Sequence, residues 1–250
     1  MKIIRYYHKE IRMAKHGKKY RAAFERVDRD KKYTPMEAVT LAKELSFANF
    51  DETVEIHVRL GVDPRHADQI VRDLVNLPHG LGKEVKVLVF AQGEDAALAR
   101  EAGADYIADG DDLINKIESG WFDFDIAIAT PNMMGKVGKL GPVLGPRGMM
   151  PNPKAGTMIP GEDLPRVIEE AKAGRIEYRV DKTANVHVPI GKVSFSEQQL
   201  HDNMGALMES LVSNRPATTK GQYVKKVVVA TSMGPGIIVD PLLAAEMEGI

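Results

Sequence analysis

The hydrophobic pattern of the strand-like segments changes twice along the chain, and this limits the possible folds more than any other feature. In residues 52–60, apolar and polar side chains alternate strictly. That pattern is typical of an antiparallel strand with one open face. Residues 85–90 and 124–129 are instead almost continuously apolar, which is typical of strands buried on both faces of a parallel sheet. Alternating strands return after residue 174. The chain therefore combines two architectures.

The middle of the chain predicts a small parallel α/β unit. Apolar segments and helix-like segments follow one another in the order β-α-β-α-β, which favours a parallel sheet with helices on both faces. The predicted strands are 85–90, 104–108 and 124–129, and the predicted helices are 94–102, 111–118 and 161–173.

The two flanking sections predict an α+β unit with an antiparallel sheet. Thr34, Pro35 and Glu37 form the signature of a capped helix start, as do Ser196 and Gln199. Helices are predicted at 34–46, 64–75 and 196–214, strands at 52–60, 175–180, 185–193 and 223–231, and a short, frayed, acidic tail at 240–250.

The simplest architecture that these patterns suggest has two domains: an outer α+β domain with an antiparallel sheet, and an inserted Rossmann-like parallel α/β domain. The outer domain is predicted to be discontinuous, at residues 1–79 and 173–250, with the inserted domain at 80–172. Because glycine tolerates large changes of backbone dihedral, Gly80, Gly82 and Gly174 are expected to form a hinge between them.

The segment 126–161 contains no aspartate or glutamate, although 35 of the 250 residues are acidic. Seven glycines and six prolines lie in it, with four cations: Lys136, Lys139, Arg147 and Lys154. Positive charge without nearby acids suits a phosphate-rich partner, whereas composition alone fits a solvated linker equally well. The outer sections carry 24 basic and 20 acidic residues, so the outer domain is the better candidate for binding a polyanion.

Several classes of chemistry are absent from the sequence. There is no cysteine, no Walker loop and no paired-histidine metal motif, so we expect no catalytic residue, metal or cofactor. No apolar run is long enough for a membrane span, and the first residues lack a secretory h-region. One alternative remains open: a small α/β enzyme that binds a phosphorylated ligand at the loop after residue 130.

The glycine- and proline-rich stretch 141–156 resembles the signature of the ribosomal protein L-one family of the bacterial large subunit. The likeness extends in order over most of the chain, through segments 15–21, 50–55, 77–80, 121–125, 173–179, 181–183 and 232–235. Many collinear matches make the resemblance specific, and it implies the inserted two-domain architecture described above.

The resemblance also implies a function and a site. Such a protein would be cytoplasmic, within the large ribosomal subunit. It would bind the mobile stalk of the large-subunit ribosomal RNA near the site that deacylated tRNA leaves, assist release of that tRNA, and repress translation of its own messenger RNA through the leader. No membrane and no small-molecule substrate are expected. The RNA-binding residues implied are Phe50, Thr53, Glu55, Lys182, Ser232, Met233 and Gly234, with His57 on the same strand face.

Each of these residues has an expected role. Glu55 would accept hydrogen bonds from 2′-hydroxyls or base edges, because a carboxylate repels phosphate. Lys182 would supply charge, while Met233 and the backbone of Gly234 would pack against the minor groove or a sugar. A second alternative also stays open: a regulator of messenger RNA alone.

The chain departs from the family pattern at both ends. Residues 1–12 precede the usual start of the family. We expect that they result from translation that begins at an upstream start codon, and the alternative is a functional arm. The tail after Gly236 is longer and more acidic, and Ser232 stands where threonine is common.

Overall fold

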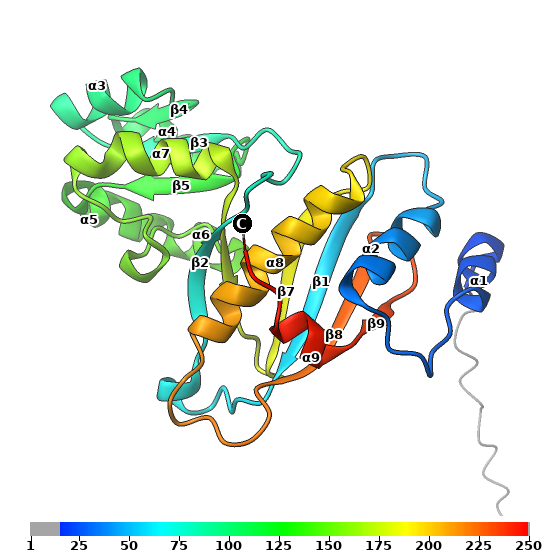
Figure 1. Cartoon of the computed structure of the whole chain (residues 1–250). Coiled ribbons are helices and arrows are strands. Elements are labelled where there is room, and N and C mark those ends of the chain that lie inside the picture. The colour runs from blue at the N-terminus through cyan, green and yellow to red at the C-terminus, as the bar shows by residue number, and fades with distance from the viewer. Residues whose placement is uncertain (1–15, 250) are drawn as a thin grey trace, which may run out of the picture.

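The computed structural model describes residues 16–249 and contains two units (Figure 1). Residues 1–12, whose role the sequence leaves open, lie outside the described residues. One hydrophobic core contains only residues from segments 23–77 and 178–244, and two further core clusters contain only residues from 85–171. This confirms the two predicted fold classes within one chain. The boundaries themselves stay a prediction.

A four-stranded antiparallel sheet, in the order β7-β1-β8-β9, forms the centre of the outer unit. Alternation in the sequence places one face of each strand in the core: the side chains of Val54, Ile56, Val58 and Leu60 are buried as predicted. The strands are β1 (Thr53–Leu60), β7 (Asn185–Lys192), β8 (Val224–Thr231) and β9 (Ile237–Val239). Only β9 is missing from the prediction.

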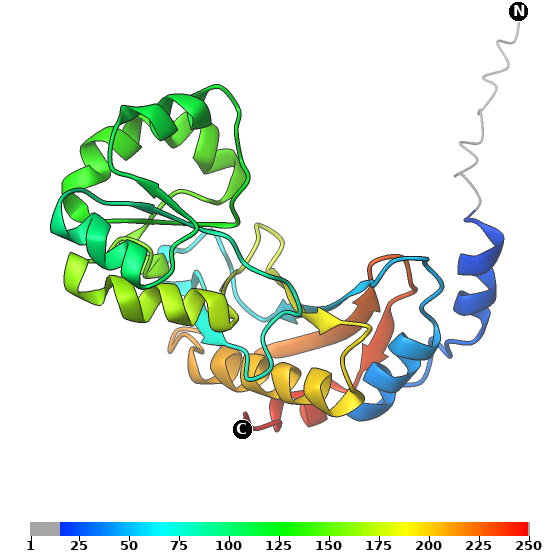
Figure 2. The same ribbon diagram turned by 90° about the horizontal axis from the view of Figure 1, so that it is seen from above.

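Within residues 16–249, helices cover one face of this sheet and leave the other without a helical layer. Figure 2 shows α2 (Pro35–Glu44) and α8 (Glu197–Ser213) on the same side of the strands. Both predicted capping boxes are present, at Thr34 and at Ser196. Because each box satisfies backbone N–H groups that the helix itself cannot bond, it fixes where the helix begins.

Two local predictions for the outer unit are wrong or incomplete. The predicted helix 64–75 is instead a 3₁₀ turn, η1 (Ala67–Gln69), followed by strand β2 (Arg72–Asn76). That strand pairs antiparallel with β6 (Arg175–Arg179), and this distant pairing overrides the local helical pattern. A basic helix, α1 (Lys18–Glu25), was not predicted.

The carboxyl end is ordered rather than frayed. Asp240 caps α9 (Pro241–Ala245) by accepting a hydrogen bond of 2.9 Å from the N–H of Leu242. Ala244 is fully buried, and the N–H of Gly249 donates to the carboxylate of Glu209 at 2.8 Å. An aspartate followed by proline is a helix-start signal, so the sequence does indicate that a helix begins here.

The inserted unit has the predicted β-α-β-α-β order around a three-stranded parallel sheet, β4-β3-β5. One face packs against α3 and α7, and the other against α4, α5 (Met134–Val137) and α6 (Gly141–Leu144). The elements are β3 (Val87–Phe90), α3 (Glu94–Glu101), β4 (Tyr106–Ala108), α4 (Asp111–Glu118), β5 (Ile126–Ala129) and α7 (Leu164–Ala173).

The acid-free segment follows the carboxyl end of β5, as expected, but it is not an open loop. It forms a chain of short helical turns, and Val137, Leu140 and Leu144 from these turns are buried in the core of the inserted unit. The turns are η2 (Pro131–Met133), α5 (Met134–Val137), η3 (Gly138–Leu140), α6 (Gly141–Leu144), η4 (Gly145–Arg147) and η5 (Pro153–Ala155).

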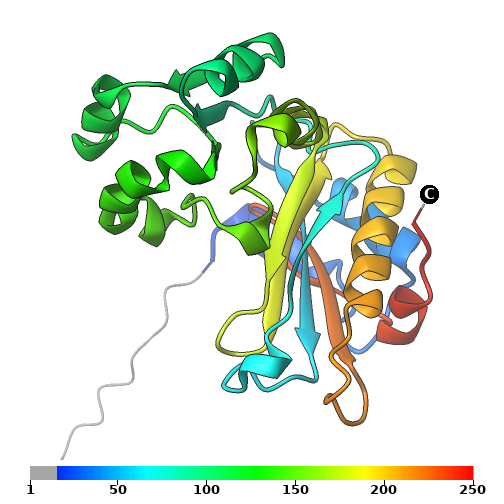
Figure 3. The ribbon, with the colours of Figure 1, turned by 90° about the vertical axis from the view of Figure 1, so that its left-hand side faces the viewer.

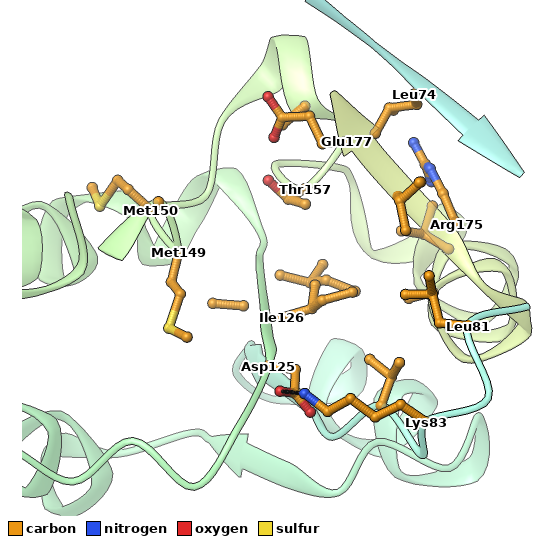
Figure 4. A pocket seen from close by; sticks show the side chains of 18 of the residues that line it. Leu74, Leu81, Lys83, Asp125, Ile126, Met149, Met150, Thr157, Arg175 and Glu177 are labelled. Carbon is orange, nitrogen blue, oxygen red and sulfur yellow. Dashed lines mark hydrogen bonds and ion pairs between the residues drawn. The ribbon is translucent and has the colours of Figure 1, made fainter. Parts of the chain in front are cut away.

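The two units meet at a cavity of about 300 Å³ (Figure 4). Leu74 and Arg175 border it from the outer unit, and Ile126, Met149 and Met150 border it from the inserted unit. In Figure 3 the inserted unit, in green, lies to one side of the antiparallel strands and α8 lies to the other. The inserted unit therefore leaves much of the outer unit's surface uncovered.

Candidate nucleic-acid interface

Strand β1 places three of the expected RNA-binding residues on the sheet face opposite the helices. Thr53, Glu55 and His57 are half-exposed, because alternate side chains of a strand point to opposite faces. In the register with β7, Glu55 lies opposite Pro189 and His57 lies opposite His187. The sequence therefore predicted the open face correctly but did not identify His187 as part of it.

The two histidines form a pair at the centre of this face. The Nδ1 atoms of His57 and His187 lie 2.8 Å apart, so one ring donates a hydrogen bond to the other. Glu55 lies 3.9 Å from His57, and Asp181 lies 3.6 Å from His187. Burial lowers the pKa of His57, and the neighbouring His187 lowers it further, against the opposing effect of Glu55. A neutral His57 beside a carboxylate suits sugar hydroxyls and base edges better than phosphate.

A buried carboxylate at the start of β1 joins two loops to the sheet. Glu52 is 0% exposed, and its Oε1 accepts hydrogen bonds from the Ser46 hydroxyl at 2.8 Å and from the Ala48 N–H at 2.9 Å. Its Oε2 accepts one from the Met233 N–H at 3.0 Å. Burial raises the pKa of Glu52, but hydrogen bonds from Thr231, Met233, Ala48 and Ser46 outweigh it and lower the pKa to about 2.

The loop after β8 is held in place by the backbone of β1. The Ser232 hydroxyl accepts a hydrogen bond of 3.0 Å from the Thr53 N–H, and the Ser232 N–H donates one of 3.0 Å to the Thr53 carbonyl. The Gly234 N–H donates to the Thr231 hydroxyl at 3.1 Å, and a Cβ on Gly234 would lie 2.4 Å from that oxygen. The Gly234 N–H is therefore bonded within the loop, and the lack of a side chain at Gly234 allows this close approach.

Two large apolar side chains project from the loops that Glu52 joins. Phe50 is 58% exposed and Met233 is 51% exposed. Single exposed apolar side chains are common, but apolar side chains that gather in one patch on a polar surface commonly mark a contact with a partner. The structure therefore brings together Phe50, Thr53, Ser232, Met233 and Gly234 around one anchored end of the sheet.

Lys182 lies at the opposite end of that sheet. It is exposed in the turn between β6 and β7, whereas Thr53 pairs with Lys192 at the far end of β7. The rise per residue of a strand places the two ends about 20 Å apart. Asp181 locks the turn by accepting hydrogen bonds of 2.8 Å from the N–H groups of Thr183 and Asn185. Any RNA that touches both ends must therefore extend along the sheet.

The basic loop is a separate surface on the inserted unit, and its charge is partly neutralised. Lys136 forms an ion pair of 2.8 Å with Asp111, and the Arg147 guanidinium lies 3.6 Å from the centre of the Phe122 ring. The expectation of cations without local compensation is thus wrong for Lys136. Lys139 and Lys154 are exposed. The positive charge that this loop presents is therefore smaller than its composition indicates.

Three structural features of the candidate site escaped prediction. Lys192 donates a hydrogen bond of 2.8 Å to the Thr53 hydroxyl and adds a cation beside the anchored loop. Glu52 has no sequence signal, because an acid before an alternating strand is normally solvated. The exposed face of α1 could have been found from its basic residues at positions 18, 19 and 21.

Metal and membrane chemistry were also assessed. Residues 16–249 contain no group of three or more potential protein ligands placed to hold a metal ion. No helix in that part of the chain is long and apolar enough to cross a bilayer.

Comparison with known proteins agrees with the earlier resemblance. The sequence profile of the Ribosomal protein L1p/L10e family matches residues 42–235. The large ribosomal subunit protein uL1 of Chloroflexus aurantiacus is 57% identical over 237 residues, which cover 94% of this chain and 100% of that protein. Its counterpart in Chloroflexus aggregans is 58% identical over 229 residues, covering 91% of this chain and 96% of that protein. The chain therefore belongs to the Ribosomal protein L1p/L10e family.

Proposed function

We propose that this protein binds the mobile stalk of the large-subunit ribosomal RNA, beside the site from which deacylated tRNA leaves. Family membership makes it a ribosomal protein of the large subunit and not an enzyme. The observation that best supports the finer proposal is the anchored end of the sheet, where Glu52 holds the exposed side chains of Phe50 and Met233 beside a polar strand face.

The chemistry of this surface suits a folded RNA. A wide, shallow RNA minor groove offers sugar hydroxyls and base edges, which Glu55 and His57 on the open face of β1 would bond. Met233 would pack against a sugar, and Lys182 would contact a phosphate at the far end of the sheet. The acid-free segment of the inserted domain, through Lys139 and Lys154, would then contact a second region of nucleic acid.

The same surface would serve two further roles. We propose that movement of the stalk with this protein assists the release of deacylated tRNA, and that the chain represses its own messenger RNA by binding a leader that imitates the stalk. Both roles place it in the cytoplasm. They use the predicted domains, with RNA held by residues 1–79 and 173–250 and the inserted domain 80–172 free to swing.

Crosslinking in cells, followed by sequencing of the attached RNA, tests this proposal. Crosslinks should concentrate in the stalk region of the large-subunit ribosomal RNA, with a second peak in the leader of the chain's own message. Co-sedimentation with large subunits separates a ribosomal component from a regulator of messenger RNA alone. Crosslinks spread evenly over total RNA, with no enrichment in the stalk, would overturn the proposal.

A further inference from the structure

A groove separates the start of α1 from the loop that carries Met233. Residues His16 to Tyr20 line one side, residues Ser232 to Gly234 line the other, and Phe47 lies between them. The Lys19 ammonium lies 3.4 Å from the Phe47 carbonyl and so links α1 to the loop that follows α2. The groove is therefore continuous with the proposed RNA-binding surface.

Three rings spaced four residues apart are stacked in a row: His16 lies just before α1, and Tyr20 and Phe24 lie on one face of that helix. The ring centres of His16 and Tyr20 lie 4.3 Å apart, and those of Tyr20 and Phe24 lie 6.0 Å apart. The planes are inclined by only 29° and 21°. We call these three residues the aromatic ladder. At one end of the ladder, the Arg29 guanidinium lies 5.4 Å from the centre of the Phe24 ring and covers it. At the other end, Tyr20 is the one ring among the described residues that stacks on His16.

Packing of α1 does not explain the ladder. The helix is anchored by Ala23 and, just beyond its end, Val27, which are both buried. His16 and Phe24 are instead exposed. Rings that stack on one another in solvent, on a helix already held by small side chains, are typical of platforms that receive a further flat group.

The charge around the ladder indicates which flat group this is. Lys18, Lys19 and Arg21 are exposed on α1, while Glu25 is the one acid between residues 16 and 26. Arg26 forms an ion pair of 2.9 Å with Glu44, so it adds little positive charge to this surface. A nucleotide combines both features, a flat aromatic base and a negatively charged phosphate, and stacking of an unpaired base tolerates any of the four bases.

We propose that this groove holds an unpaired nucleotide of the bound RNA, with its base stacked on His16 as the next member of the aromatic ladder and its phosphate near Lys18 and Lys19. This inference rests on the proposed function. It adds a contact to single-stranded RNA beside the contacts that β1 makes with paired RNA.

Two transcripts and four variants test the inference. One transcript contains the stalk region of a bacterial large-subunit ribosomal RNA, and the other is the same RNA with its unpaired nucleotides removed so that the helices are continuous. The variants are His16→Ala, Tyr20→Leu, Tyr20→Phe and, as a matched control, His66→Ala, which removes an exposed histidine beyond the other end of β1.

His16→Ala and Tyr20→Leu should weaken binding of the first transcript about 10-fold, given the usual strength of base stacking on aromatic side chains. Tyr20→Phe retains a ring and should bind like the wild type, as should His66→Ala. None of the variants should change binding of the fully paired transcript. Because His16 is exposed, its truncation should not alter the unfolding midpoint, so that variant stays informative if Tyr20→Leu loosens α1.

The outcomes separate the two proposals. Wild-type protein that binds neither transcript overturns the proposed function and this inference with it. Binding that Met233→Ala weakens, but that His16→Ala and Tyr20→Leu leave unchanged, overturns this inference alone.

Discussion

The backbone N–H of Met233 donates a hydrogen bond of 3.0 Å to the carboxylate of Glu52, 181 residues away in the sequence. The other oxygen of that carboxylate is bonded to the loop after α2. One buried side chain therefore sets the relative position of two loops that carry the exposed side chains of Phe50 and Met233. The shape of the proposed RNA surface therefore depends on a carboxylate that is itself buried.

The first prediction concerns stability at acidic pH. In the folded chain the pKa of Glu52 is about 2, against an ordinary value of 4.5. Because the unfolded chain binds the proton more readily, this group stabilises the fold above about pH 4.5, and the stabilisation is lost as pH falls toward 2. A shift of this size corresponds to about 3 kcal/mol. Glu52→Gln should lower the free energy of unfolding at pH 7 by a similar amount and flatten its pH dependence between 2 and 4.5.

Urea unfolding at a series of pH values measures both effects. Asp181 also has a pKa lowered to about 2, so the comparison with wild type isolates the contribution of Glu52. Glu55→Gln is the matched control, because Glu55 is half-exposed on the same strand and should change stability little. Equal effects of the two substitutions would contradict the anchoring role of Glu52.

A second prediction separates binding from stability. Phe50→Ala and Met233→Ala should each raise the Kd for a stalk-region transcript at least fivefold, because each removes apolar area buried only in the complex. The free energy of unfolding should change by less than about 0.5 kcal/mol, as is usual for exposed side chains. Leu242→Ala is the control: Leu242 is 64% exposed on α9, and its loss should affect neither quantity. A parallel loss of stability and affinity would argue against direct contact.

The third prediction uses salt. Each phosphate contact contributes about 0.7 to 0.9 to the slope of log Kobs against log salt concentration. Lys182→Met should therefore reduce the magnitude of that slope by nearly one, if RNA extends the length of the sheet to the β6–β7 turn. Lys172→Met is the control, since Lys172 pairs with Asp105 at 3.2 Å in the inserted unit. An unchanged slope for the Lys182 variant would show that RNA stays at the Met233 end.

The sequence predicts those parts of the fold that local patterns determine. Three of these patterns depend on residues less than ten positions apart. They are the alternation in β1, the continuous apolar strands of the inserted unit and the two capping boxes. The strand β2 could not be found this way, since its pairing with β6 is a contact across a hundred residues. The same reason hides the anchor of the site, because nothing near Glu52 in the sequence reveals that Met233 will bond to it.

The final prediction concerns the two chain segments that connect the outer unit to the inserted unit. Gly174 has a φ of 111°, and a Cβ there would lie 2.4 Å from the Cα of Gly80 on the other connecting segment. Gly174→Ala should therefore cost both backbone strain and a steric clash, for a loss of more than about 2 kcal/mol. Gly120→Ala is a matched control: its φ is 96°, but a Cβ there meets nothing within 4 Å. The control should cost only the strain, about 1 kcal/mol.

Thermal and urea unfolding of both variants test this difference, and solution scattering shows whether it affects the arrangement of the two units. Because the two connecting segments touch at Gly80 and Gly174, forcing them apart should change the scattering profile of Gly174→Ala and leave that of Gly120→Ala like the wild type. Equal losses of stability with identical profiles would mean that strain alone, and not contact between the segments, makes glycine necessary at position 174. The contact between the two connecting segments would then place no steric limit on the predicted hinge at Gly80, Gly82 and Gly174.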